Sequence, residues 1–203
     1  PAQVLTPARY LMERGVQCLF VGTEVSDEKA AEAERFIQDK YGVPAIVHGL
    51  YSMRIPYISS VWAALELRRR SKRFIREFRP THVYARGYNA AVAARRVARE
   101  MGATLVFDVR GVASAETGLK RGEGPVYRFI LGRELSEIRK ADRLTCVSHH
   151  LKDWILRHTG RSDVSVIPCC VDLSQFSYRE QARREIRERY GLAPEEKIGR
   201  AHV

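Results

Sequence analysis

The stretch that decides the fold is residues 141–176, ADRLTCVSHHLKDWILRHTGRSDVSVIPCCVDLSQF. Residues 143–147 are rich in β-forming side chains, and Ser148 follows them with a hydroxyl suited to accept a backbone N–H at a helix start. Four side chains then recur at helical spacing and give the helix one apolar face: Leu151, Trp154, Ile155 and His158. Gly160 ends this helix, and residues 164–167 form a second buried strand. The stretch therefore predicts a strand–helix–strand unit.

Strand and helix patterns alternate along the rest of the chain. Strands are predicted at residues 16–23, 44–47, 81–85 and 104–109. Helices are predicted at residues 1–14, 27–41, 90–101, 125–140 and 179–190, a further long helix within residues 56–78, and a loop at residues 110–124. In the long helix the inward stripe is Leu67, Ser71, Phe74, Ile75 and Phe78. This alternation predicts an α/β fold: a Rossmann-like parallel sheet with helices on both faces.

Composition is ordinary for a globular protein, with 45% hydrophobic and 29% charged residues in a chain of 203. That length suits one α/β domain with at most part of another. The sequence has neither an apolar run of the roughly 18 residues that span a membrane nor a signal-peptide pattern. Its four cysteines lack the paired spacing of a zinc site, so we expect reduced thiols, a cytoplasmic setting and no bound metal.

A strong positive charge is the main departure from this average picture. The formal net charge is +11, and much of it lies in residues 67–80, LRRRSKRFIREFRP. With the apolar stripe turned inward, a basic outer surface is expected from Arg68, Arg69, Lys72, Arg73 and Arg76. Glu66 and Glu77 are too few to neutralise it. A plain solvated helix face is the alternative, but an anionic membrane surface or a phosphorylated acceptor fits better. Nucleic acid is not expected, because no recognised motif accompanies the charge.

Polar residues follow three of the predicted strands, and ligands bind at the carboxyl ends of parallel strands. The candidates for substrate binding are Arg86, Gly87, Arg110, Gly111 and Ser148. Asp108 is the candidate catalytic residue, because a carboxylate at a strand end can hold or deprotonate a hydroxyl group. Asp108 has an alternative structural role as a cap of the loop or as a partner of Arg110, and Arg86 has one in a surface or intra-sheet ion pair. His149 and His150 are expected to face solvent, since adjacent helical residues point in different directions.

The opening stretch also resembles a known family, the sugar-nucleotide-dependent glycosyltransferase family 4 of GT-B type. Members commonly carry a segment similar to ADRVICVSE, a helix, and then VIPNGVDLERF. Here Ala141-Asp142-Arg143, Val147-Ser148, Val166-Ile167-Pro168, Val171-Asp172-Leu173 and Gln175-Phe176 stand at the matching places. Cys169-Cys170 replace the usual Asn-Gly. A second resemblance covers residues 182–193, which are similar to the family's linker helix.

The resemblance implies a division of the chain. Residues 1–176 are expected to be the N-terminal, acceptor-side domain without its first strand, which ordinarily precedes the helix at residues 1–14 together with a glycine-rich loop. Residues 177–197 are expected to be an interdomain linker helix, and residues 198–203 a non-native tail. The donor-binding C-terminal domain is expected to be absent, so the fragment itself should not turn over.

The resemblance also implies a function. The intact protein is expected to transfer a sugar, with retention, from a nucleoside diphosphate sugar to a lipid-linked or saccharide hydroxyl in cell-envelope polysaccharide or glycolipid synthesis. No cofactor is expected, and the enzyme would lie in the cytoplasm or peripherally on the inner face of the membrane. Asp108 would orient the acceptor hydroxyl or the transferred sugar, and Asp172 would lie near the donor cleft.

Two other protein classes remain open at this point. A nucleotide-binding Rossmann oxidoreductase predicts a G-x-G-x-x-G run between a strand and a helix, and the sequence has none. A non-catalytic α/β module would instead bind an anionic partner through its basic helix.

Overall fold

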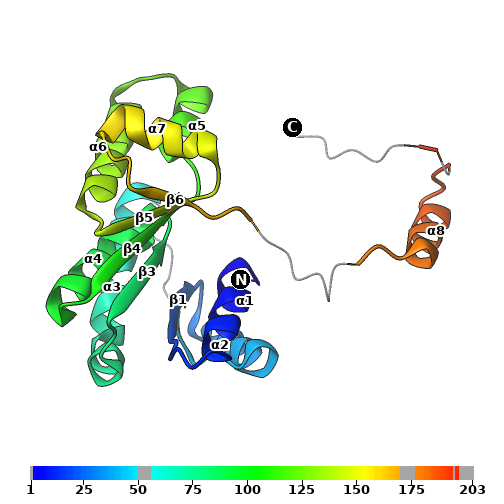
Figure 1. Ribbon diagram of the computed structural model, residues 1–203, viewed down its shortest axis with the longest axis horizontal. Helices are drawn as coiled ribbons and strands as arrows, with labels where there is room; N and C mark the ends of the chain where they lie inside the picture. Colours follow the sequence, from blue (N-terminus) through cyan, green and yellow to red (C-terminus); the bar gives the residue numbers. More distant parts are fainter. Residues whose placement is uncertain (1, 50–55, 170–176, 194, 197–203) are drawn as a thin grey trace. The chain divides into compact units, whose positions relative to one another are not determined.

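The computed structural model describes residues 2–49, 56–169, 177–193, 195 and 196 (Figure 1). The chain divides into two compact units, Pro1–Cys169 and Cys170–Val203. Within the described residues, the first unit holds every strand, and all the strand pairings are parallel. In the second unit, the described helix is α8 (Glu180–Arg189).

Helices and strands alternate through the first unit. Its strands are β1 (Phe20–Glu24), β2 (Ala45–Gly49), β3 (His82–Arg86), β4 (Thr104–Val109), β5 (Arg143–Cys146) and β6 (Val164–Val166). Its helices are α1 (Ala2–Met12), α2 (Asp27–Tyr41), α3 (Pro56–Phe78), α4 (Tyr88–Met101), α5 (Ala113–Arg121), α6 (Pro125–Lys140) and α7 (His149–Thr159).

Four of the strands form one sheet in the order β3-β4-β5-β6 (Figure 1). The register places Ala85, Phe107, Leu144 and Val164 side by side across it. All four are buried, and they join residues of α4, α6 and α7 in one hydrophobic cluster. Because successive side chains of a strand point to opposite faces, these four fix which face of the sheet is the core.

The next row of the same register lies on the opposite face. It consists of Arg86, Asp108, Thr145 and Ser165, one from each strand. All four residues are the last or the next to last of their strands. The same pairing that buries the apolar row therefore lines up polar side chains on the other face of the sheet.

The remaining two strands, β1 and β2, pair separately as a two-stranded sheet. Their own core contains Leu5 of α1, Ile37 of α2 and Val47 of β2. Ser26 caps α2 by accepting the backbone N–H of Lys29, and Gly42 ends the helix in the left-handed conformation. Two parallel sheets therefore stand where one was expected from the sequence.

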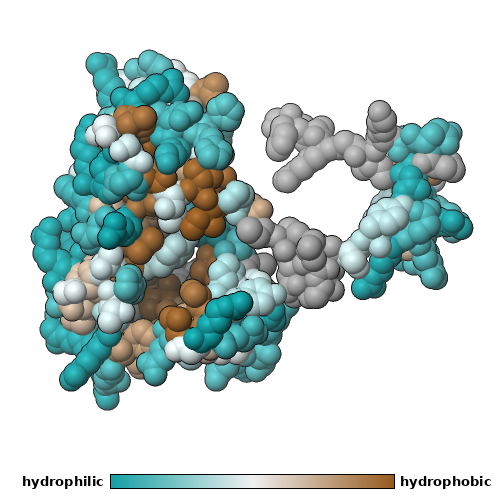
Figure 2. Space-filling model, viewed as in Figure 1, coloured by the Kyte–Doolittle hydropathy of each residue, from teal (hydrophilic) through white to brown (hydrophobic). Residues whose placement is uncertain are grey.

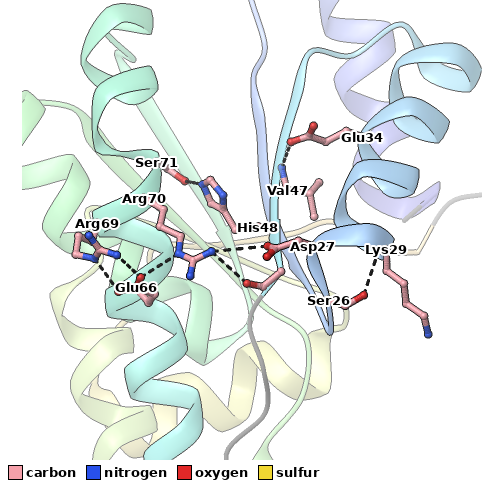
Figure 3. A network of polar contacts seen from close by, with 11 residues as sticks. Ser26, Asp27, Lys29, Glu34, Val47, His48, Glu66, Arg69, Arg70 and Ser71 are labelled. Atoms are coloured by element: carbon pink, nitrogen blue, oxygen red, sulfur yellow. Dashed lines mark hydrogen bonds and ion pairs between the residues drawn. The ribbon is translucent and has the colours of Figure 1, made fainter.

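Helix α3 links the two sheets, because it packs on α4 and also contacts β1 and β2. Figure 3 shows the polar contacts at this junction. Ser71, fully buried on α3, lies 3.0 Å from Nε2 of His48 on β2. Arg70 of α3 bonds Glu66 at 2.9 Å and the Gly49 carbonyl at 3.4 Å, and it lies 3.8 Å from Asp27 of α2. We call this set the α3 junction.

Most predicted elements are confirmed. The helices α2 and α6 and the strand β4 have the predicted bounds, and α3 fills the range within which a long helix was predicted. In the predicted strand–helix–strand unit, Ser148 accepts the Leu151 N–H at 3.2 Å and Gly160 ends α7 in the left-handed conformation. The parallel arrangement that was expected to bring the loops after β3, β4 and β5 to one edge is also confirmed.

Three predictions are wrong in detail. The segment predicted as a loop contains α5, whose N-terminus is capped from α6 rather than by its own sequence. Strand β1 begins at Phe20 and not at residue 16, because its partner β2 begins at Ala45, directly opposite Phe20. Phe74 is 45% exposed although it was predicted to point inward. It lies about 60° around the helix from the buried Ser71, on the flank of the inward stripe.

The α3 junction predicts a pH-dependent stability. Burial, together with the neighbouring Arg70 charge, lowers the pKa of His48 below its usual 6.5, although Glu34, Asp27 and Glu66 oppose the shift. The unfolded chain therefore binds a proton at a pH where the folded chain does not, and stability falls as pH drops below about 6.5. His48→Gln should flatten this part of the profile in urea unfolding measured at several pH values.

The control for that profile is His150→Gln, because His150 is exposed on α7. It should keep the slope of the unmodified protein. An unchanged slope in His48→Gln would show that other groups cause the pH dependence.

Candidate functional site

The candidate site lies at the carboxyl ends of β3, β4 and β5. Asp108 is 2% exposed, and its Oδ1 accepts a 2.9 Å hydrogen bond from the Thr145 hydroxyl on the neighbouring strand. Its Oδ2 lies 3.5 Å from Nη1 of Arg110. Burial and a hydrogen bond to Asp108 also raise the pKa of Tyr84 to about 12. The carboxylate is thus enclosed by groups from three strands and the following loop.

Two arginines meet beside this carboxylate. Arg86, at the end of β3, and Arg110, after β4, both donate to the side-chain oxygen of Gln3 on α1, the second at 3.3 Å. Arg110 also donates to the thiol of Cys169 at 2.8 Å. Among the described residues, Arg86 has no carboxylate partner, so its alternative role in a surface or intra-sheet ion pair is not what the structure shows. Of the two arginines, Arg110 has a carboxylate contact among the described residues and Arg86 has none, so the site keeps an excess of positive charge.

The backbone around the arginines is held in place. Gly87 has φ +81°, a conformation that favours glycine, and its N–H donates to the Asp108 carbonyl at 3.2 Å. Gly111 does not need glycine for its backbone conformation, and a Cβ there would meet nothing within 4 Å. Gly87 therefore takes a backbone conformation that other residues rarely adopt. At Gly111 the missing side chain leaves open space, and Tyr88 holds its carbonyl by a 3.2 Å hydrogen bond.

A buried glutamate anchors the loop that carries Arg110. Glu134 of α6 is 2% exposed and accepts the backbone N–H of Ala113 at 2.6 Å and of Ser114 at 3.2 Å. The Ser114 hydroxyl donates to the same carboxylate at 2.5 Å. Val112, the residue before α5, has no side chain that can cap a helix. Glu134 therefore supplies the cap from a distance, and burial raises its pKa.

Several residues of the candidate site were missed by sequence reasoning. Thr145, Tyr84 and Gln3 are brought to Asp108 and the arginines by pairing and packing. The sequence did contain a signal for Thr145, because Thr145 directly follows the apolar Leu144 in a predicted strand. Its side chain is therefore expected on the opposite face of the sheet from Leu144. Glu134 also left a signal, since it lies four residues from Ile130 and from Ile138 on the same helix face.

Some candidate residues do not join this cluster. Ser148 is engaged as the cap of α7, and His149 and His150 are exposed as predicted. Asp172 and Cys170 lie outside the described residues. Within the part of the chain that the structure describes, no group of three His, Cys, Asp or Glu side chains is placed to hold a metal ion.

The basic helix α3 is only partly as predicted. Arg68 does not belong to an outer surface, because it turns toward α4 and pairs with Glu100. Arg69 donates to Glu66, as Arg70 does, and these bonds lower the pKa of Glu66 to about 2. Arg73 pairs with Glu77 at 2.9 Å. Among the described residues, Lys72 and Arg76 have no carboxylate partner, so the uncompensated charge is smaller than the sequence indicates.

The capping role of Glu134 predicts a large effect of its removal. Glu134→Ala leaves two backbone N–H groups and a buried hydroxyl without their acceptor, and should lower the free energy of unfolding by about 3 kcal/mol. Glu134→Gln keeps an acceptor oxygen and should cost about 1 kcal/mol. Urea unfolding measures both. Glu123→Ala, at an exposed glutamate before α6, should change the value by less than about 0.5 kcal/mol, and an equal loss there would contradict the capping role.

Comparison with known proteins shows the family of the chain. The family model "Glycosyltransferase Family 4" matches residues 2–175. No curated protein sequence matches the chain. The structure is similar to Anabaena Alr3699/HepE in complex with UDP and glucose, with a TM-score of 0.62 and 13% identity over 94% of this chain and 46% of that one.

A plant protein gives the same picture. Glycyrrhiza uralensis UGT73P12, complexed with glycyrrhetinic acid 3-O-monoglucuronide, is similar with a TM-score of 0.52 and 13% identity, over 86% of this chain and 47% of that one. Both are GT-B glycosyltransferases, and at these identities the likeness shows the fold. The chain spans about half the length of these neighbours. The oxidoreductase and the non-catalytic module are not supported, and the chain belongs to glycosyltransferase family 4.

Proposed function

We propose that the intact protein transfers a sugar from a nucleoside diphosphate sugar to an acceptor hydroxyl, with retention of configuration and without a bound cofactor. Membership of glycosyltransferase family 4 supports the reaction class. The donor class is supported by the Anabaena neighbour, which has been solved in complex with UDP and with UDP-glucose. Retention and a role in cell-envelope polysaccharide or glycolipid synthesis rest on the family resemblance of the sequence.

One observation links the proposal to particular residues: two guanidinium groups donate hydrogen bonds to Gln3. Arg86 and Arg110 donate to the same amide oxygen, and Arg110 also lies 3.5 Å from the carboxylate of Asp108. Guanidinium groups suit the oxygens of phosphate, which they bind through paired hydrogen bonds. A phosphate of the donor, or of a phosphorylated acceptor, would replace the neutral amide oxygen of Gln3. We therefore assign phosphate binding to Arg86 and Arg110.

Asp108 has a different role in this scheme. Its carboxylate is almost fully buried and is held by Thr145, so its position is fixed before substrate arrives. The 3.5 Å contact with Arg110 is long for a charge-assisted hydrogen bond. Once a phosphate draws Arg110 away, Oδ2 is free to accept a bond from the acceptor hydroxyl or the transferred sugar. We propose Asp108 as the group that orients this hydroxyl.

The remaining candidates border this centre. Gly87 and Gly111 keep the backbone around the arginines free of side chains, which allows close approach of a ligand. The N-terminus of α7, at Ser148, offers backbone N–H groups of the kind that stabilise an anion. Asp172 keeps its proposed place near the donor cleft. Because the chain spans about half of its structural neighbours, we also propose that the isolated chain binds phosphate groups but does not turn over.

The first test is binding of inorganic pyrophosphate to the chain by calorimetry. Arg86→Ala and Arg110→Ala should each weaken binding by about tenfold or more, because each removes a charge-assisted hydrogen bond. Arg96→Ala is the matched control, since Arg96 is exposed on α4 and absent from the site. In the intact protein, Asp108→Asn should lower kcat for sugar transfer from UDP-sugars with little change in KM for the donor. A normal kcat would remove Asp108 from the catalytic role, and equal binding by all three arginine variants would refute the phosphate site.

We further propose that the enzyme works in the cytoplasm and binds an anionic membrane surface through α3. No helix in the described part of the chain is long and apolar enough to cross a membrane. Lys72 and Arg76 lie one turn apart on α3 and, among the described residues, lack a carboxylate partner. Charges of this kind near an anionic leaflet contribute about 1 kcal/mol each at moderate salt.

Vesicle binding tests this surface. Lys72→Gln with Arg76→Gln should weaken binding to phosphatidylglycerol vesicles by about tenfold or more. Lys120→Gln with Arg128→Gln removes the same charge from exposed positions on α5 and α6 and should change binding much less. An equal effect of the two pairs would show that net charge, and not α3, determines the attraction.

A further inference from the structure

Two hydrogen bonds tie the loop after β3 to the loop after β4. The Gly87 N–H donates to the Asp108 carbonyl at 3.2 Å, and the Tyr88 hydroxyl donates to the Gly111 carbonyl at 3.2 Å. The two accepting carbonyls lie on either side of Arg110 in the chain. The segment that carries Arg110 is therefore held against the segment that begins α4. We call this pair of bonds the loop tie.

Tyr88 is itself held in place by packing. It is the first residue of α4, and its ring meets the ring of Phe107 edge to face, with the centroids 5.3 Å apart. Burial, together with the charge of Glu134, raises the pKa of Tyr88 above its usual 10. The phenol therefore stays protonated at neutral pH and keeps donating to Gly111. A side chain of α4 thus fixes the backbone beside Arg110.

A second anchor holds the same loop from α6. The Glu134 carboxylate accepts the backbone N–H groups of Ala113 and Ser114, which follow Gly111 by two and three residues. The segment from Asp108 to Ser114 is thus bonded at β4, at Gly111 and at the start of α5. Because it is held at both ends and in the middle, its arginine starts from a fixed backbone position.

A cavity bounds the arginine pair on one side. Gln3 and Arg86 line a cavity of about 950 Å³ together with Val4 and Phe20, among others. Figure 2 shows apolar surface gathered around a hollow in this unit. Arg86 is therefore not packed on the side of the cavity. Its position relative to Arg110 depends on contacts on its other sides, and the loop tie is one of them.

The spacing of the two guanidinium groups decides whether one phosphate group can bind both. Both groups donate to the side-chain oxygen of Gln3, so their N–H groups already converge on one point. Charge-assisted hydrogen bonds are short, and hydrogen bonds weaken steeply when their geometry is poor. A shift of one loop relative to the other would let a phosphate keep one guanidinium and lose the other.

We propose that Tyr88 is a positioning residue of the phosphate site, which holds Arg110 in register with Arg86 through its bond to the Gly111 carbonyl. Glu134 supports the same loop from its other end. Tyr88 does not touch the ligand and acts through the two arginines. The inference deepens the proposed function and rests on the assignment of phosphate binding to these arginines.

Pyrophosphate binding to Tyr88→Phe tests this role. The substitution removes the hydroxyl but keeps the ring against Phe107, so the chain should stay folded while binding of inorganic pyrophosphate weakens about three- to tenfold. Tyr41→Phe is the matched control, because Tyr41 is buried in the separate core of β1 and β2 with an edge-to-face contact to Phe36. It should leave binding unchanged. Unchanged binding by Tyr88→Phe would overturn the proposal.

A double-mutant cycle separates positioning from a general effect on the fold. In chains that carry Arg86→Ala or Arg110→Ala, one guanidinium of the pair remains and there is no spacing to maintain. Adding Tyr88→Phe to either chain should therefore weaken pyrophosphate binding by less than about twofold. An equal loss in the unmodified chain and in both arginine variants would show that Tyr88 acts on the whole unit, which contradicts the proposal.

The order of the Arg110 side chain gives a test without any ligand. Relaxation of the ¹⁵N nucleus at Nε of Arg110 should give a lower order parameter in Tyr88→Phe than in the unmodified chain. Nε of Arg96, which is exposed on α4, should keep its value. An equal order parameter at Arg110 in the two chains would show that the loop tie does not position this residue.

The outcomes also distinguish this inference from the proposed function. Weak binding by Arg86→Ala and Arg110→Ala with normal binding by Tyr88→Phe would leave the phosphate site in place and remove the role of Tyr88. Equal binding by the arginine variants and the unmodified chain would refute the phosphate site itself, and this inference with it.

Discussion

The parallel register of β3, β4 and β5 is the constraint on which the rest of the first unit depends. It sets Ala85, Phe107 and Leu144 in one buried row, and it sets Arg86, Asp108 and Thr145 in the next row on the other face. A shift of one residue in any pair would move a polar side chain into the core and an apolar one out of it. Burial of the apolar row therefore fixes the register. The same register places Arg86 and Thr145 beside Asp108 on the other face of the sheet.

The sequence was enough to predict those features that local patterns determine. The capped helix after Ser148, the long helix α3 and the strand at Thr104–Val109 follow from spacing, capping and side-chain type. The positions of Arg86, Asp108 and Arg110 at one edge also followed, because parallel strands end together. The family could be predicted because short segments of residues 141–176 resemble it at matching spacings.

The features that could not be predicted depend on partners far away in the chain. Helix α5 has no cap of its own, and Glu134 supplies one from another helix, so local propensity did not reveal it. The meeting of Gln3 with two arginines joins residues more than eighty positions apart. Likewise, the charge on α3 was overestimated because Glu100 of α4, which neutralises Arg68, is not a neighbour in sequence.

The distant cap of α5 has a consequence for the order in which the chain acquires structure. Ala113 precedes Glu134 by 21 residues, so on a growing polypeptide the start of α5 is made well before the carboxylate that satisfies it. Isolated helices as short as α5 are marginal in water. Helix α5 and the loop that carries Arg110 would therefore settle only after α6 has emerged from the ribosome. The arginine site would therefore be completed after α6 is made, and not when the loop that carries Arg110 is made.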